Sequence, residues 1–251
     1  MDALEAALDQ VGFAMIEDAL DVAELASLTD AVDDFHRRRG GGTLHELGFL
    51  GADERFAEVV DHPAVLPVVV ATLGWNVFMY HCHLDVHPPA REEPRWRWHQ
   101  DGGRQNVELA SPRPRLSVKV AWFLTDVTRE DMAPLWVLPG SHLQDRLERP
   151  ADGSVAPPGA TPLLVRAATA VVFDRRLWHA RGDNTSDVTR KVLFFAYTYR
   201  WIRPRDDLDL SASFLAGTSP TRRQLLGEGT SAIGHWIPTE EDVPLRAVVE
   251  A

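Results

Sequence analysis

Thiols, long apolar runs and positive charge are all scarce in this sequence of 251 residues. Cys82 is the only cysteine, so no disulfide can form within the chain. No apolar run approaches the roughly 20 residues that span a bilayer, and the start of the chain lacks the basic region of a secretory signal. The 26 basic residues against 37 acidic ones leave a formal net charge of −11, which disfavours nucleic acid and membranes as partners. These absences predict a cytoplasmic protein.

Imidazole and indole, by contrast, are plentiful, with ten histidines and eight tryptophans. A chain rich in imidazole and poor in thiol favours nitrogen and oxygen ligands for any metal that it binds. The length corresponds to one or two domains at about 150 residues each. We expect a single domain over residues 1–251, since we find neither an internal repeat nor a low-complexity segment.

The first third of the chain has the periodicity of helices. One apolar face predicts a helix that is capped by Asp21 and closed by the glycines at 40–42; its residues are Val22, Leu25, Leu28, Val32 and Phe35. Shorter helices are expected at 2–9, 53–60 and 63–73, with Gly74 as the last stop, and a strand at 11–16. We therefore predict a helical N-terminal flank over about 1–74.

From Trp75 onward the apolar period changes to two, which is typical of strands. Strands are expected at 75–87, 116–124, 135–138, 163–165, 170–173 and 192–199, separated by Gly, Pro and Asp turns. Many short strands with such turns favour an antiparallel sandwich or barrel with helices packed outside. We expect this barrel over about 75–201, followed by a C-terminal extension over 202–251.

The histidines form clusters that compete as metal ligands. A site of two histidines and one carboxylate presents three ligands on one side of the metal. His99 and Asp101 stand two residues apart before a Gly-Gly turn, which lets both side chains reach one metal. Another set shares one face of a strand without such a turn and is interpreted as cavity lining or a solvent-facing edge; it consists of His81, His83, Asp85 and His87.

His179 and Arg190 carry little weight singly, because each is an ordinary residue type for a packed or exposed position. Together they are more informative. If His179 ends one barrel strand and Arg190 begins the next, a guanidinium lies near the metal. Its planar fork suits a carboxylate bound through both oxygens. We infer a co-substrate that carries a carboxylate.

Three segments together resemble one known family. The first is Trp98–Asp101, the second is the Pro-Gly-Ser-His stretch that ends at His142, and the third is Trp178-His179 with Arg190 eleven residues on. In this order they are similar to the phytanoyl-CoA dioxygenase family, and the resemblance extends from about residue 11 to 201. These enzymes are non-haem oxygenases that depend on Fe(II), 2-oxoglutarate and O2. The resemblance implies a double-stranded β-helix, a jelly-roll barrel of the cupin type. It also implies His99, Asp101 and His179 as catalytic iron ligands, and Arg190 as the partner of the distal carboxylate of 2-oxoglutarate.

The resemblance extends to weaker assignments. Lys119 falls where family members often have a threonine that holds the same carboxylate, although a lysine could also extend outward at a barrel edge. His81 falls where a glutamine often reaches the other end of the co-substrate. Arg181, two residues after the second histidine ligand, departs from the small residue common there. It either faces solvent or binds an anion.

The implied reaction is hydroxylation of a small molecule with release of succinate and CO2. An intact Asp101 argues for oxygenation and against halogenation, while desaturation, epoxidation and ring formation use the same ligands. For the substrate pocket we expect His83, Trp122, Trp136 and Trp201, and such aromatic lining predicts a mostly apolar substrate, such as a natural-product intermediate. Two alternatives stay open: a cupin-like metal-dependent isomerase or hydrolase built on the His81–His87 face, and a barrel that binds a small molecule without turnover. The oligomeric state is not predicted.

Overall fold

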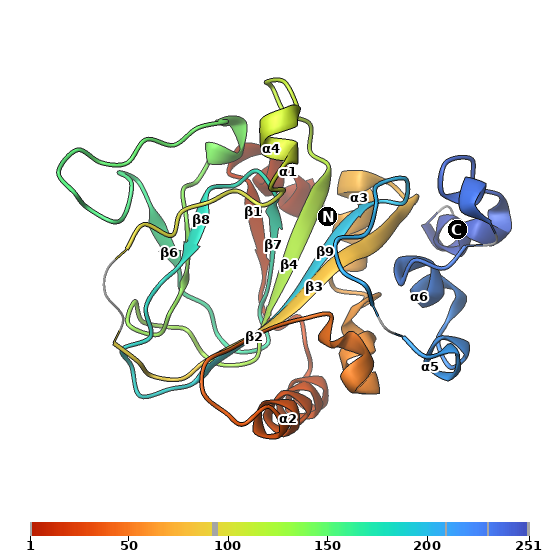
Figure 1. Ribbon diagram of the computed structural model, residues 1–251, viewed down its shortest axis with the longest axis horizontal. Helices are drawn as coiled ribbons and strands as arrows, with labels where there is room; N and C mark the ends of the chain where they lie inside the picture. The colour runs from red at the N-terminus through yellow and green to blue at the C-terminus, as the bar shows by residue number, and fades with distance from the viewer. Residues whose placement is uncertain (1, 92–94, 209, 230, 250–251) are drawn as a thin grey trace.

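Two antiparallel sheets face each other in the computed structural model, which describes residues 2–91, 95–208, 210–229 and 231–249 (Figure 1). The larger sheet runs in the order β1 (Phe13–Ile16), β7 (Ala170–Asp174), β4 (Ser117–Phe123), β9 (Arg190–Tyr199), β3 (Val77–His87) and β2 (Leu44–Leu47). The smaller sheet runs in the order β6 (Thr161–Leu163), β5 (Leu135–Val137) and β8 (His179–Arg181). The predicted fold class, a mainly β double-stranded β-helix, is confirmed.

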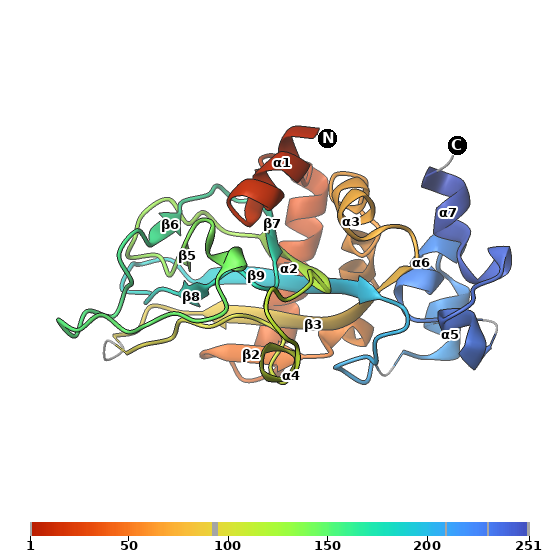
Figure 2. The same ribbon diagram turned by 90° about the horizontal axis from the view of Figure 1, so that it is seen from above.

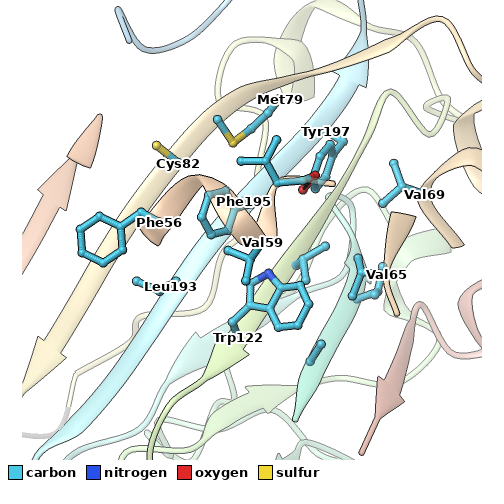
Figure 3. Packing of buried hydrophobic residues seen from close by; sticks show 14 of the residues in the cluster. Phe56, Val59, Val65, Val69, Met79, Cys82, Trp122, Leu193, Phe195 and Tyr197 are labelled. Carbon is cyan, nitrogen blue, oxygen red and sulfur yellow. Dashed lines mark hydrogen bonds between the residues drawn. The ribbon is translucent and has the colours of Figure 1, made fainter. Parts of the chain in front are cut away.

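The four inner strands of the larger sheet, β7, β4, β9 and β3, are buried on both faces, and successive residues divide between two cores. On β4, Val118, Val120 and Trp122 belong to the cluster on the helical side. Ala121 and Phe123 belong to the cluster between the two sheets. Figure 3 shows the first cluster, where side chains of the sheet interlock with those of the helical flank. The space between the sheets is therefore lined by alternate residues of β3, β4 and β9.

Three helices cover the outer face of the larger sheet: α1 (Asp2–Gln10), α2 (Val22–Arg38) and α3 (Leu66–Leu73) (Figure 2). The sequence predicted each of them. Helix α2 begins at a capping box, in which the backbone N–H of Glu24 donates to the Asp21 carboxylate at 2.8 Å and Asp21 N–H donates to the Glu24 carboxylate at 2.7 Å. The expected helix at 53–60 is a 3-10 helix, Glu54–Val59, preceded by another at Phe49–Ala52.

The C-terminal extension folds against the N-terminal end of β3 (Figure 1). It contains α5 (Ala212–Ala216), α6 (Pro220–Leu225) and α7 (Pro244–Val249). Gln224 joins it to the sheet, since its amide donates to the carbonyls of Trp75 at 2.8 Å and Val77 at 3.2 Å. The division of a single domain into flank, barrel and extension stays a prediction. Among the described residues no helix is long and apolar enough to cross a membrane, and the predicted compartment stays a prediction.

Candidate metal centre

The three predicted metal ligands lie together at one edge of the smaller sheet. His99 and His179 face each other in an isolated antiparallel bridge, where each backbone N–H donates to the other residue's carbonyl at 3.0 Å. Their ring centroids are 4.3 Å apart. One donor atom of each of His99, Asp101 and His179 lies within 4.8 Å of the others. His179 begins β8, whereas the sequence placed it at the end of a strand.

Backbone carbonyls orient both imidazoles. Nδ1 of His99 lies 2.9 Å from the carbonyl oxygen of Arg97, and Nδ1 of His179 lies 2.8 Å from that of Leu177. Because a carbonyl only accepts, each Nδ1 carries the proton and each Nε2 keeps a free lone pair, as a metal ligand requires. Burial and, to a smaller extent, the neighbouring His99 together lower the pKa of His179 to about 3, so the ring is neutral at physiological pH.

The turn after Asp101 depends on glycine. Gly102 has a φ of +113°, and a Cβ there would overlap the guanidinium of Arg175. Arg175 donates to the side-chain oxygen of Asn106 at 3.0 Å, and the Asn106 amide donates to the carbonyl of Asp101 at 2.9 Å. These bonds connect the turn to the short helix α4 (Gln105–Glu108) and so fix the position of Asp101.

Lys119 points into the space between the sheets. Its Nζ lies 2.7 Å from Oδ2 of Asp101 and 5.9 Å from the ring centroids of Phe173 and Phe194. The outward orientation that the sequence left open is therefore excluded. Burial favours the protonated acid, but Lys119 and the two histidines together hold the pKa of Asp101 well below its usual range. Lys119 contacts a predicted metal ligand, and its predicted contact with the co-substrate stays a prediction.

Arg190 is the first residue of β9, and it is almost fully buried at 2% exposure. Its Nε and Nη1 have no hydrogen-bond partner within the described part of the chain, and the guanidinium carbon lies 5.4 Å from the ring centroid of Phe123. Burial lowers its pKa to about 10; Asp85 opposes this change, and Arg181 adds to it. A buried cation with unpaired donors is costly in isolation, so this position suits an anionic ligand.

The side chains of the second histidine cluster contact mainly one another and nearby carboxylates. Nδ1 of His83 lies 3.0 Å from Nε2 of His81, whose own Nδ1 lies 2.7 Å from a carboxylate oxygen of Asp206. Asp85 lies 2.6 Å from Nδ1 of His45. Neither His45 nor Asp206 was predicted, since β2 has no strand signal and Asp206 lies in the extension. His45, His83 and Asp85 form a second group with the composition of a metal site.

Both clusters open into one cavity of about 630 Å³, which Lys119 and Arg190 also line. His81 and His83 are among its walls, but the three tryptophans are not. Trp122 points to the helical side of β4 and packs against His62, with ring centroids 5.1 Å apart (Figure 3). Trp136 lines a separate hollow, and Trp201 stacks on Tyr199 at the surface.

These positions correct the predicted pocket. Lys119 and Trp122 are three residues apart on one strand, and residues at odd separations point to opposite faces. The prediction of a mostly apolar substrate rested on the tryptophans and loses that support, because most of the residues that line the cavity are polar or charged.

A double-stranded β-helix with two histidines and a carboxylate at its mouth is the architecture of the non-haem iron oxygenases that use 2-oxoglutarate. The sequence model of the phytanoyl-CoA dioxygenase family matches residues 8–192. The chain belongs to this family and is an Fe(II)- and 2-oxoglutarate-dependent dioxygenase that acts on small molecules.

Individual relatives and solved structures are similar to this chain over much of its length. Rv1501, an uncharacterized protein of Mycobacterium tuberculosis, is 30% identical over 82% of this chain and 78% of its own. The L-proline trans-4-hydroxylase of Streptomyces griseoviridis is 31% identical over 58% of this chain and 63% of its own. Among solved structures, HygX of Streptomyces hygroscopicus, with nickel and 2-oxoglutarate bound, has a TM-score of 0.67 at 16% identity and covers 85% of this chain and 93% of its own. That likeness concerns the fold.

Proposed function

We propose that this enzyme hydroxylates a small organic molecule and converts 2-oxoglutarate into succinate and CO2 in the same turnover. One observation carries the proposal: His99, Asp101 and His179 converge on the same cavity as Arg190, a buried cation with unpaired donors. Nε2 of each histidine and the Asp101 carboxylate would hold Fe(II), leaving three positions for the co-substrate and O2. When bound, the iron supplies the activation of O2, of which one atom enters succinate and the other enters the product.

The remaining side chains bind and orient. Arg190 would hold the distal carboxylate of 2-oxoglutarate, because two charge-assisted hydrogen bonds satisfy donors that otherwise have no partner. Lys119 holds the Asp101 carboxylate in place by the ion pair at 2.7 Å. The walls of the cavity limit the access of water to the reacting atoms. The hydroxylation named for the relative from Streptomyces griseoviridis supports the same reaction type here.

The second cluster, His45, His83 and Asp85, favours one alternative, a cupin-like isomerase or hydrolase that binds its metal at these residues. Two features of the structure disfavour it. Two of its three candidate ligands, Asp85 and Nδ1 of His45, are hydrogen-bonded to each other at 2.6 Å, and Nδ1 of His83 lies 3.0 Å from Nε2 of His81. The His99–Asp101–His179 group has free Nε2 atoms on both histidines, which favours it as the metal site.

Metal binding and succinate formation test the proposal directly. Purified wild-type protein with Fe(II), 2-oxoglutarate and O2 should form succinate slowly even without the substrate. His99→Ala should lose both the metal and the succinate, whereas His83→Ala should keep the metal. If His99→Ala bound iron as the wild type does while His83→Ala lost it, the isomerase or hydrolase alternative would replace the proposal.

A further inference from the structure

The cavity gathers positive charge in a chain that is acidic overall. Its walls carry two carboxylates, Asp85 and Asp101, and five cationic side chains: Lys119, Arg181, Arg190, Arg203 and Arg205. Fe(II) and 2-oxoglutarate carry opposite charges of equal size, so loading the site with both leaves this excess unchanged. The excess predicts a further anion in the cavity.

Three of the five cations are accounted for near the metal and the co-substrate. Lys119 is paired with Asp101 at 2.7 Å. Arg190 is assigned to the distal carboxylate under the proposed function, and Arg181 donates to the carbonyl of Gly182 at 3.1 Å. Arg203 and Arg205 differ, since neither side chain forms an ion pair or a hydrogen bond anywhere in the described residues. They are exposed at the mouth of the cavity.

The segment 203–206, here called the arginine strap, is held firmly against β3. The backbone N–H of Arg205 donates to the carbonyl of Tyr80 at 2.9 Å. One carboxylate oxygen of Asp206 accepts from the backbone N–H of Cys82 at 2.9 Å and lies 2.7 Å from Nδ1 of His81. The strap is thus positioned before any ligand arrives, which lowers the entropic cost of binding to its two guanidiniums.

The strand register separates the strap from Arg190. Arg190 pairs with His87 on β3, whereas the neighbours of Tyr80 pair with Ala196 and Tyr197, six or seven residues further along β9. At about 3.3 Å per residue the two positions are about 20 Å apart along the strand. Lys119, which contacts Asp101, pairs with Ala196 and so stands level with the strap. A 2-oxoglutarate that extends from the metal ligands to Arg190 therefore points away from the strap.

We infer that the substrate carries an anionic group, a carboxylate or a phosphate, which binds Arg203 and Arg205 while the rest of the molecule reaches the metal ligands. The inference rests on the proposed function and adds the substrate class to it. Charge-assisted hydrogen bonds from two guanidiniums are specific for carboxylate and phosphate oxygens. Asp206, the acidic residue within the strap, is engaged by His81 and by the backbone N–H of Cys82, and neither Asp206 nor Asp207 is among the cavity walls.

Paramagnetic line broadening tests the inference without knowledge of the substrate. Protein loaded with Mn(II) and saturating 2-oxoglutarate under anaerobic conditions is mixed with small probes. Trifluoroacetate and its neutral analogue trifluoroacetamide are followed by fluorine NMR; methyl phosphate and trimethyl phosphate are followed by phosphorus NMR. Arg203→Ala/Arg205→Ala is compared with Arg146→Ala/Arg166→Ala, a control that removes two exposed arginines outside the cavity and the same charge.

The wild type and the control should broaden the anionic probes at least fivefold more than the neutral ones, and the strap variant should lose most of this difference. The anionic probe with the larger broadening relative to its own neutral analogue then identifies carboxylate or phosphate as the preferred group. Equal broadening by the strap variant and the wild type, with Mn(II) and 2-oxoglutarate bound to both, would overturn the inference and leave the proposed function intact. A wild type that bound neither Mn(II) nor 2-oxoglutarate would refute the proposed function, and this inference with it.

Discussion

Arg190 offers a test in which stability and ligand binding change in opposite directions. Its pKa of about 10, against 12.5 for a free arginine, corresponds to about 3 kcal/mol of destabilisation of the charged form. Replacing it with methionine removes this buried charge together with two unpaired donors, Nε and Nη1. The lost interaction with the Phe123 ring offsets about 1 kcal/mol. Arg190→Met should therefore stabilise the ligand-free protein by about 2 kcal/mol, which raises Tm by about 4–8 °C in a chain of this size.

Binding of 2-oxoglutarate should give the wild type the higher Tm of the two proteins, the reverse of the order without ligand. At a hundred times its Kd, 2-oxoglutarate stabilises a protein by about 2.7 kcal/mol, so with Mn(II) present it should raise the Tm of the wild type and leave Arg190→Met unchanged. Differential scanning calorimetry with and without ligand measures both effects. Arg175→Met is the matched control, because Arg175 is equally buried but donates to Asn106 and to the Pro114 carbonyl, and its loss should lower Tm. An Arg190→Met protein that is less stable than the wild type and still responds to 2-oxoglutarate would refute the reasoning.

Three further predictions concern other walls of the site. Lys119→Met should leave Asp101 as an unpaired buried charge, so the metal-free protein should lose about 3 kcal/mol of stability. The variant should also bind Mn(II) at least tenfold more tightly than the wild type, and weaker binding in an EPR titration would contradict this. Trp122→Ala should cost about 3–5 kcal/mol in urea unfolding, with the KM for 2-oxoglutarate unchanged, because the indole lies on the helical side of β4. Burial holds the pKa of His83 well below 6.5, so below that pH the unfolded chain takes up a proton that the folded one does not. Stability should fall as the pH drops from 7.5 to 5.5, and His83→Gln should flatten that fall.

The parts of the fold that could be predicted are those with local causes. Helix α2 followed from its apolar face and from Asp21 as the cap, and both are present. The pair His99 and Asp101 was preferred because of the glycine turn, and the turn does place Asp101 beside the second histidine. In these cases the deciding interactions lie within a few residues of each other, so the pattern of residue types is sufficient.

The errors arose where contacts join distant segments. Asp206 meets His81 across 125 residues, and no local pattern marks that pairing. Strand β2, with His45, exists because it pairs with β3, and its four residues carry no strand signal of their own. The tryptophans are a different case: once Lys119 is placed inside the barrel, strand alternation puts Trp122 on the other face. The sequence left the direction of Lys119 open, so the alternation alone did not fix the face on which Trp122 lies.

The cations of the cavity differ in how deeply they are buried, and this difference fits the two anions assigned to them. Arg190 is buried at 2% exposure, where the low local dielectric strengthens an ion pair and salt screens it little. A co-substrate common to every turnover gains from such a tight and pre-oriented position. Arg203 and Arg205 are exposed, so an anion bound there is screened by salt and exchanges readily, as substrate and product must. Raising the ionic strength should therefore weaken binding at the strap more than binding of 2-oxoglutarate, which separates the two sites within one protein.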